Sequence, residues 1–369
     1  MDPLTTGRSY IRLVSFFRNA IETLEPYTPG DQPAPGSRTI KLNTNENPYP
    51  PSPHALDALR QVNPDQLRRY PRSRGDEFRE AVAEVLALDQ TWVLPGNGSD
   101  ELLTVLIRSV TGPGRPLVYP TPTYVLYSTL AEIQGAPAIE VPFDDNFALP
   151  VELLQAARGT LTIVANPNSP SGTTTRIERL SILAAGLKGL LVIDEAYVAF
   201  ADDDALSLVQ HHPNVVILRT LSKSHSLAGL RLGFVVAQPE VIEGLVKVKD
   251  SYNVGAVAAQ VGAAAIRDVD HTRRTIAKIR ESRRRLTVAL ETMGCRVWPS
   301  QANFLLIRPP DGDAKQVYRK LGSRGILVRY FGKQPLSDKL RITIGTDEEQ
   351  AVLLESLAEI LSGGPAAIG

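Results

Sequence analysis

The segment that decides the fold spans residues 189–234 and reads GLLVIDEAYVAFADDDALSLVQHHPNVVILRTLSKSHSLAGLRLGF. It holds two continuous, β-branched apolar runs, residues 190–193 and 215–218, which are too short to be core helices. Such runs are typical of strands buried on both faces of a parallel sheet. Ligands in an open α/β sheet bind outside the carboxyl ends of the strands. The polar residues that follow the two runs are therefore expected to face one crevice of an α/β fold.

The polar residues after the two runs predict a covalent cofactor site. A lysine amine can form a Schiff base with a carbonyl cofactor, and Lys223 follows the second run. Pyridoxal phosphate makes three further demands, for which suitable groups are present. Asp194 would pair with the protonated pyridine nitrogen, and Tyr197 would donate to the ring hydroxyl. Ser222 and Arg231 would bind the phosphate. We therefore predict Lys223, Asp194 and Tyr197 as catalytic residues.

The motifs DEAY (194–197), SK (222–223) and GLR (229–231) together resemble the aspartate-aminotransferase superfamily of pyridoxal-phosphate enzymes. Within it, TLSKSHSLAGLRLGF (220–234) is most similar to the histidinol-phosphate aminotransferases. The resemblance implies conversion of L-histidinol phosphate and 2-oxoglutarate to imidazole-acetol phosphate and L-glutamate. Two related activities stay open, namely an aromatic amino-acid transaminase and a threonine-phosphate decarboxylase. A regulator's effector domain is disfavoured, because no helix-turn-helix or basic extension precedes the motifs.

Composition narrows the class of partner. The 369 residues include 40 basic and 40 acidic side chains, so the net charge is zero, which argues against nucleic-acid and membrane-surface partners. A single cysteine, Cys295, excludes an internal disulfide framework and a cysteine-rich metal site, and the five histidines show no ligand spacing. No apolar run approaches the roughly 20 residues that span a bilayer, and no secretory signal is apparent. We expect a cytoplasmic enzyme with small-molecule substrates and no metal.

A second motif, TWVLPGNGSDELL (91–103), predicts a phosphate cradle. A short strand over 91–94 meets a glycine-rich turn, and a helix opens at Ser99 and Asp100. Glycine at Gly98 lets the backbone approach an anion, and the helix start offers free N–H groups. The motif lacks the GxGxxG spacing and the lysine of nucleotide-binding loops. We therefore assign Gly98, Ser99 and Asp100 to the cofactor phosphate.

Three further cofactor contacts follow from the resemblance alone. It implies that Tyr124 stacks on the pyridine ring and that Asn168 donates to the ring hydroxyl. The family usually reads NPNNPTG where this chain reads NPNSPSG (166–172), so Ser169 takes the place of the second asparagine. The tyrosine of the family's YP pair, Tyr70, is expected to reach the cofactor phosphate of a partner subunit. This implies a homodimer.

The resemblance also implies a substrate pocket. Tyr27 in EPYTPG (25–30), Asn45 in KLNTNENPYPPSP (41–53) and Tyr252 are expected to line it. Arg341 in LRITIGT (340–346) matches the family's contact with the substrate anion, and Arg329 in ILVRY (326–330) is a second candidate. A planar guanidinium is the natural clamp for a carboxylate or phosphate.

The order of strands and helices predicts two domains and an arm. Residues 1–45 are expected to form a helix and an extended Pro- and Gly-rich arm that joins the small domain or a dimer contact. Residues 46–250 would form a large domain with a mostly parallel central sheet flanked by helices. Residues 251–369 would form a smaller α/β domain. His225, where the family often has an aromatic residue, is expected to pack rather than to act.

Overall fold

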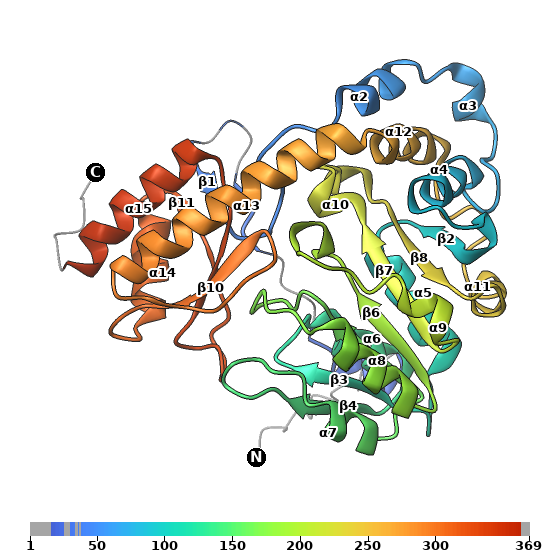
Figure 1. The fold of residues 1–369 in the computed structure, drawn as a ribbon, viewed down its shortest axis with the longest axis horizontal. Coiled ribbons are helices and arrows are strands. Elements are labelled where there is room, and N and C mark those ends of the chain that lie inside the picture. Colours follow the sequence, from blue (N-terminus) through green and yellow to red (C-terminus); the bar gives the residue numbers. More distant parts are fainter. Residues whose placement is uncertain (1–15, 26–29, 34–35, 37, 363–369) are drawn as a thin grey trace, which may run out of the picture.

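A computed structural model of the chain describes residues 16–25, 30–33, 36 and 38–362. Its central feature is a seven-stranded sheet on the right of Figure 1, covered by helices on both faces. In spatial order the strands are β2 (Val93–Gly96), β8 (Gly233–Ala237), β7 (Val215–Thr220), β6 (Leu190–Asp194), β5 (Leu161–Ala165), β3 (Leu117–Thr121) and β4 (Ala138–Pro142). Strand β8 runs antiparallel to both of its neighbours, and the other neighbours pair in parallel. The predicted α/β class with a mostly parallel sheet is confirmed.

Alternation of side chains explains why the strands are continuously apolar. In β6, Leu191 and Ile193 join one buried cluster, whereas Val192 joins the cluster on the opposite face. Both faces are covered, so the inner positions of this strand, 191–193, are all buried and apolar. Helices contributing to the first cluster are α2 (Pro53–Arg60), α4 (Asp76–Leu86), α7 (Val151–Ala156), α8 (Ile177–Gly186), α9 (Leu208–His211) and α12 (Ala256–Arg267). The second cluster is formed with α5 (Ser99–Val110), α6 (Leu126–Gln134) and α11 (Pro239–Val246).

A smaller antiparallel sheet lies on the left of Figure 1, where the last third of the chain is drawn in orange and red. Its strands in spatial order are β12 (Arg329–Tyr330), β13 (Leu340–Thr343), β10 (Phe304–Arg308) and β9 (Arg296–Val297). The helices that pack with it are α13 (Val269–Thr292), α14 (Ala314–Ser323) and α15 (Asp347–Leu361). Helix α15 begins with a capping box in which Thr346 and Glu349 satisfy each other's backbone N–H groups.

The N-terminal arm belongs structurally with the C-terminal part. Strand β1 (Ile40–Lys41) pairs in parallel with β11 (Ile326–Leu327), and Leu42 is buried in the core of the smaller sheet. Helix α12 instead packs against α2 and α4, beside the larger sheet. We therefore propose that the two domains, whose division the sequence places near residue 250, separate at the start of α13.

The remaining described elements are short. They are α1 (Asn19–Glu22), α3 (Pro64–Arg68), α10 (Leu221–Ser224) and the 3-10 turns η1 (Gln90–Trp92), η2 (Val198–Phe200) and η3 (Ala228–Leu230). In the described part of the chain, no helix is both long and apolar enough to cross a membrane.

Candidate active site

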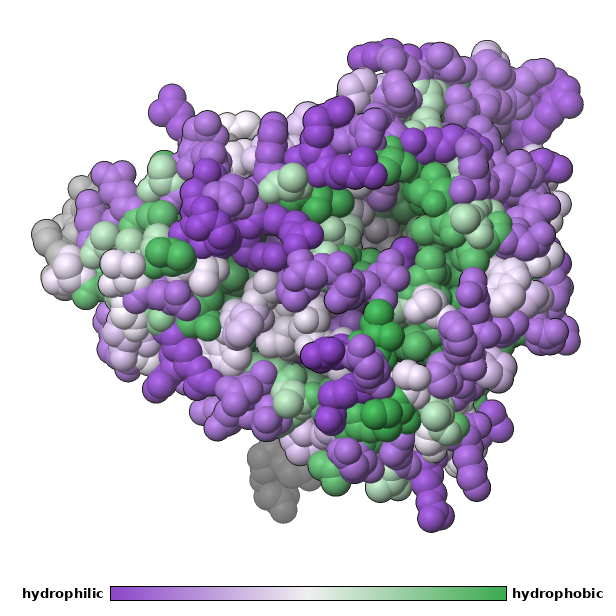
Figure 2. All heavy atoms as spheres, viewed as in Figure 1, coloured by the Kyte–Doolittle hydropathy of each residue, from purple (hydrophilic) through white to green (hydrophobic). Residues whose placement is uncertain are grey.

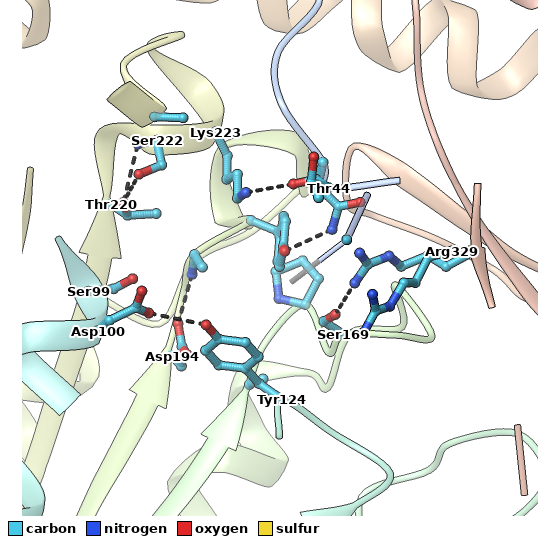
Figure 3. Close-up of a pocket in the computed structure, with 18 of the residues that line it drawn as sticks. Thr44, Ser99, Asp100, Tyr124, Ser169, Asp194, Thr220, Ser222, Lys223 and Arg329 are labelled. Carbon is cyan, nitrogen blue, oxygen red and sulfur yellow. Dashed lines mark hydrogen bonds between the residues drawn. The ribbon is translucent and has the colours of Figure 1, made fainter. Parts of the chain in front are cut away.

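A cavity of about 190 Å³ opens at the carboxyl ends of β5, β6 and β7, between the larger sheet, the arm and the smaller sheet. Figure 3 shows side chains from all three regions pointing into it. The structure brings together most of the residues predicted from the sequence. The predicted residues that line the cavity are Asn45, Ser99, Asp100, Tyr124, Asp194, Tyr197, Ser222, Lys223, Arg231, Arg329 and Arg341.

Lys223 sits on the short helix α10, directly after β7. The helix starts at this point because the Thr220 hydroxyl accepts a hydrogen bond from the Ser222 backbone N–H. The Lys223 Nζ donates to the Thr44 carbonyl oxygen over 3.0 Å, as Figure 3 shows. The side-chain amide of Asn47 donates to the Lys223 carbonyl over 3.1 Å. The segment 44–47 therefore contacts both the backbone and the amine of this lysine.

Asp194 ends strand β6 as a buried carboxylate. Its Oδ2 accepts a hydrogen bond of 2.6 Å from the Tyr127 hydroxyl, and its Oδ1 accepts one of 3.1 Å from the Ala196 backbone N–H. Burial raises the pKa of Asp194 to about 6, although both hydrogen bonds favour the charged form. A buried carboxylate of this kind is suited to pair with a cationic ring nitrogen, because the cation would offset the cost of its burial.

The predicted phosphate cradle is a cluster of donors around Gly98. This glycine has φ +86°, and an added Cβ would lie 2.8 Å from the Arg231 Nη2, so a side chain there would displace the guanidinium. Arg231 donates to Asp100 Oδ2 over 3.2 Å and approaches the Ser222 hydroxyl at 3.5 Å. Helix α5 begins at Ser99, so its first backbone N–H groups lack intrahelical partners. These donors fit a phosphate group.

The two predicted arginines lie at the side of the cavity formed by the smaller sheet. Arg341 donates to the Ser169 hydroxyl and to the Asn43 carbonyl oxygen, each over 3.0 Å. In Figure 3, Arg329 and Ser169 lie across the cavity from Ser222 and the start of α10. The cavity thus has an amine and a phosphate cradle on one side and guanidinium groups on the other.

Asn168 is not among the residues that line the cavity. Its Nδ2 donates to the Pro122 carbonyl at 3.3 Å and to the Ser171 hydroxyl at 2.9 Å, and its Oδ1 accepts from Thr123. Both amide hydrogens are therefore used in holding the loop. The next residue, Ser169, lines the cavity instead.

Tyr70 and Tyr252 also lie outside the cavity of their own chain. Their rings stack on each other with centroids 4.6 Å apart, and they are 81% and 49% exposed. Tyr27 lies outside the described residues.

The sequence did not identify Tyr127, Thr44 or Asn43, which also line the cavity. Tyr127 lies in the first turn of α6 and packs edge-on against Tyr124, which precedes the helix. Thr44 and Asn43 act through their backbone carbonyl oxygens. Because every residue type has such an oxygen, the sequence gives no indication of these contacts.

The fold and this lysine-centred site define an aminotransferase of the pyridoxal type. Residues 37–357 match the model of the family "aminotransferase class I and II", and the chain belongs to this family. It is 51% identical over 349 residues to histidinol-phosphate aminotransferase 1 of Trichormus variabilis, covering 95% of this chain and 100% of that protein. It is 44% identical over 335 residues to the histidinol-phosphate aminotransferase of Rhodopirellula baltica, covering 90% and 92%.

A solved structure agrees with these relatives. Histidinol-phosphate aminotransferase from Sinorhizobium meliloti, in complex with pyridoxal 5′-phosphate, superposes with a TM-score of 0.87 at 28% identity. The match covers 95% of this chain and 99% of that one. The described residues contain no group of three or more His, Cys, Asp or Glu side chains that could hold a metal ion.

Proposed function

We propose that this chain is a histidinol-phosphate transaminase that uses pyridoxal 5′-phosphate and passes the amino group to 2-oxoglutarate. The observation that carries the proposal is the composition of one cavity. It joins an amine, a buried carboxylate and an anion cradle to two arginines on the opposite side. The names of relatives that are 51% and 44% identical over most of the chain support this substrate.

The donor set of the cavity fits the cofactor. Lys223 would hold its carbonyl carbon, and Asp194 would pair with its ring nitrogen. Arg231, with the Ser222 hydroxyl and the first N–H groups of α5, would bind its phosphate. When bound, pyridoxal phosphate supplies an electron sink for the carbanion left when the substrate loses a proton.

Lys223 would move the proton. In this structure its amine rests on the Thr44 carbonyl, so it is held inside the cavity by a neutral acceptor. A lysine amine in this position can take a proton from the amine-bearing carbon of the substrate and return it elsewhere. Tyr197 accepts a hydrogen bond of 2.9 Å from Asn45, which leaves its own hydroxyl hydrogen to donate into the cavity.

Arg341 and Arg329 would recognise the anionic end of both substrates. A phosphate on one substrate and a carboxylate on the other can each accept two parallel hydrogen bonds from a guanidinium. Aromatic amino acids lack the phosphate, and their transamination remains the competing activity within this family. Threonine phosphate carries both anions, so its decarboxylation is a further outcome that the experiment must separate.

We also propose a cytoplasmic homodimer in which Tyr70 reaches the cofactor phosphate of the partner subunit. The large exposure of Tyr70 and Tyr252 supports this arrangement, since a stacked aromatic pair is rarely left in water. Sedimentation of the purified chain would test it. A monomer at micromolar concentration that retains full activity would contradict it.

The first experiment is a visible absorption spectrum of the purified, cofactor-loaded protein during addition of L-histidinol phosphate without a keto acid. We expect the band of the lysine-bound cofactor to convert to that of pyridoxamine phosphate. Conversion with phenylalanine but not with histidinol phosphate would move the assignment to an aromatic transaminase. Release of carbon dioxide from threonine phosphate would indicate a decarboxylase. Failure to bind the cofactor would contradict the proposal as a whole.

A further inference from the structure

The buried side chain of Tyr127 contacts Asp194, the carboxylate proposed to face the cofactor, and has no role in the proposed reaction. Tyr127 is fully buried on α6, and its hydroxyl donates to Asp194 Oδ2 over 2.6 Å. The second carboxylate oxygen is held by the Ala196 backbone N–H. Each oxygen therefore has one donor from the protein, and the remaining lone pairs can face the cavity.

The ring of Tyr127 is itself held in place by two neighbours. Tyr119 packs edge-on at 6.0 Å between centroids, and Tyr124 packs edge-on at 5.7 Å. Both contacts are of the favourable T-shaped kind. The Tyr127 hydroxyl is thus held beside Asp194 by the packing of its own ring, and it holds one of the two carboxylate oxygens.

The groups around Asp194 make the hydrogen bond from Tyr127 important for keeping Asp194 ionised. Besides Tyr127, the side chains that face the same region are Asp100 from α5 and the phenols Tyr124 and Tyr197, with Lys223 and Arg231 across the cavity. Asp100 and burial both disfavour an ionised Asp194, and neither Lys223 nor Arg231 forms a hydrogen bond or ion pair with it among the described contacts. The Tyr127 hydroxyl and the Ala196 N–H are the groups that favour the charged form.

We propose that Tyr127 is a positioning residue for the cofactor, whose hydroxyl keeps the Asp194 carboxylate ionised and oriented toward the ring nitrogen. This inference rests on the proposed function, because it assigns Tyr127 a role toward the same cofactor. It differs from a packing role, since a packed phenylalanine would fill the same space without donating a hydrogen bond.

The test is a calorimetric titration of the full-length, cofactor-free protein with pyridoxamine 5′-phosphate between pH 5 and pH 8. This probe cannot form a Schiff base with Lys223, so its affinity reports the non-covalent contacts. Wild type is compared with Tyr127→Phe and with Tyr119→Phe as a matched control. Tyr119 is another buried tyrosine of the same cluster, but its hydroxyl donates to Glu140, away from the cavity.

We expect wild type to lose affinity as the pH falls through about 6, where Asp194 becomes protonated. Without the phenol the carboxylate loses a donor that favours its charged form, so its pKa rises. In Tyr127→Phe the acidic loss of affinity should therefore begin about one pH unit higher, with roughly threefold weaker binding near pH 6.5 and about tenfold weaker binding near pH 5. Tyr119→Phe should follow wild type.

Three results have distinct meanings. No binding to wild type at any pH would overturn the proposed function together with this inference. Binding to wild type with an unshifted acidic limb in Tyr127→Phe would overturn the inference alone. Equal weakening of Tyr127→Phe at every pH would also overturn it, because a purely structural role lowers affinity without moving the limb.

Discussion

The side-chain amide of Asn45 donates a hydrogen bond of 2.9 Å to the phenolic oxygen of Tyr197, and the same residue is tied to the smaller sheet. Its Oδ1 accepts from the Thr343 hydroxyl and its carbonyl oxygen accepts from the Asn303 amide, each over 3.0 Å. Tyr197 follows a strand of the larger sheet, whereas Thr343 ends β13 of the smaller sheet and Asn303 directly precedes its strand β10. The position of the phenol therefore depends on how the two sheets are held together.

Two replacements of Asn45 should distinguish the effect of losing the hydrogen bond to Tyr197 from the effect of backbone strain. Asn45 has φ +58°, which glycine adopts freely and alanine does not. Asn45→Ala and Asn45→Gly both remove the hydrogen bond to Tyr197, so both should lower kcat by a similar factor of about ten. Only Asn45→Ala adds the strain of a left-handed backbone, about 1 kcal/mol in urea unfolding. Equal stability of the two variants, or an unchanged kcat, would contradict the structure at this point.

Lys223→Ala should abolish turnover while pyridoxamine 5′-phosphate still binds. The substitution removes the only amine among the described side chains that line the cavity, and with it the group that moves the proton. Rate measurements under single-turnover conditions, with the bound cofactor quantified in parallel, would check this. Residual transamination above about a thousandth of the wild-type rate would assign the proton transfer to another group.

The buried Glu195–Arg219 pair should be important for stability rather than for chemistry. The Glu195 side chain is fully buried, and its Oε2 lies 2.7 Å from Arg219 Nη2. Glu195→Ala would leave the guanidinium with Asp204 alone, at 3.1 Å, and should lower the free energy of unfolding by about 3 kcal/mol. Glu178→Ala, which removes an exposed partner of Arg176, should have a far smaller effect, because water screens an exposed ion pair. Similar losses in urea unfolding would contradict this ranking.

His225 should make the protein less stable in mild acid. Burial lowers its pKa from 6.5 to about 4, so the folded protein keeps it neutral where the unfolded chain protonates it. The unfolded state therefore binds more protons between these pH values, and the free energy of unfolding falls as the pH falls through them. His225→Phe should reduce the loss of stability between pH 7 and pH 5 by about 1–2 kcal/mol relative to wild type.

The matched control for this measurement is His211→Asn, because His211 lies exposed at the end of α9. Its pH profile in urea unfolding should overlay that of wild type.

His225 also lines a cavity of about 740 Å³ beside α10, and Figure 2 shows a hollow flanked by hydrophobic residues below the junction of α12 and α13. A profile of His225→Phe that matches wild type would mean that water in this hollow keeps the imidazole hydrated.

Arg341→Lys should raise the KM for histidinol phosphate at least tenfold. The guanidinium bridges the Ser169 hydroxyl and the Asn43 carbonyl oxygen, and a lysine ammonium cannot hold both and still meet an anion in a planar fork. Steady-state kinetics would check this against Arg308→Lys, which alters an ion pair with Asp338 on the same small sheet. Unchanged KM in Arg341→Lys would remove this residue from the substrate site.

The sequence predicted the framework of the site because its residues follow strand ends. Asp194, Ser222 and Lys223 are each located by a buried strand that the apolar pattern reveals, and the sheet brings the strand ends together. Residue type alone did not decide which loop side chain turns inward. Asn168 uses its amide to hold the loop and Ser169 faces the cavity, which depends on hydrogen bonds to Pro122 and Ser171.

Contacts made through the backbone or across the two sheets were beyond prediction for a related reason. The Thr44 carbonyl that receives Lys223 could belong to any residue type, and the Asn45–Thr343 bond joins positions 298 residues apart. Periodicity reports which face of an element is buried but not what packs against it. Tyr127 is such a case, since no residue pattern indicates that its partner is Asp194, 67 residues further along the chain.

The parallel pairing of β1 with β11 has a consequence for how the chain is made. During synthesis, residues 40 and 41 leave the ribosome long before their pairing partners, residues 326 and 327. Leu42 likewise stays exposed until the C-terminal residues that form the core around it have been synthesised. The seven-stranded sheet is complete once residue 237 has emerged, so it can fold during synthesis while the arm is still unpaired. The active site needs both, because Thr44 and Asn45 lie just beyond β1. Cofactor capture should therefore be among the last events of biosynthesis, after the final strands have been released.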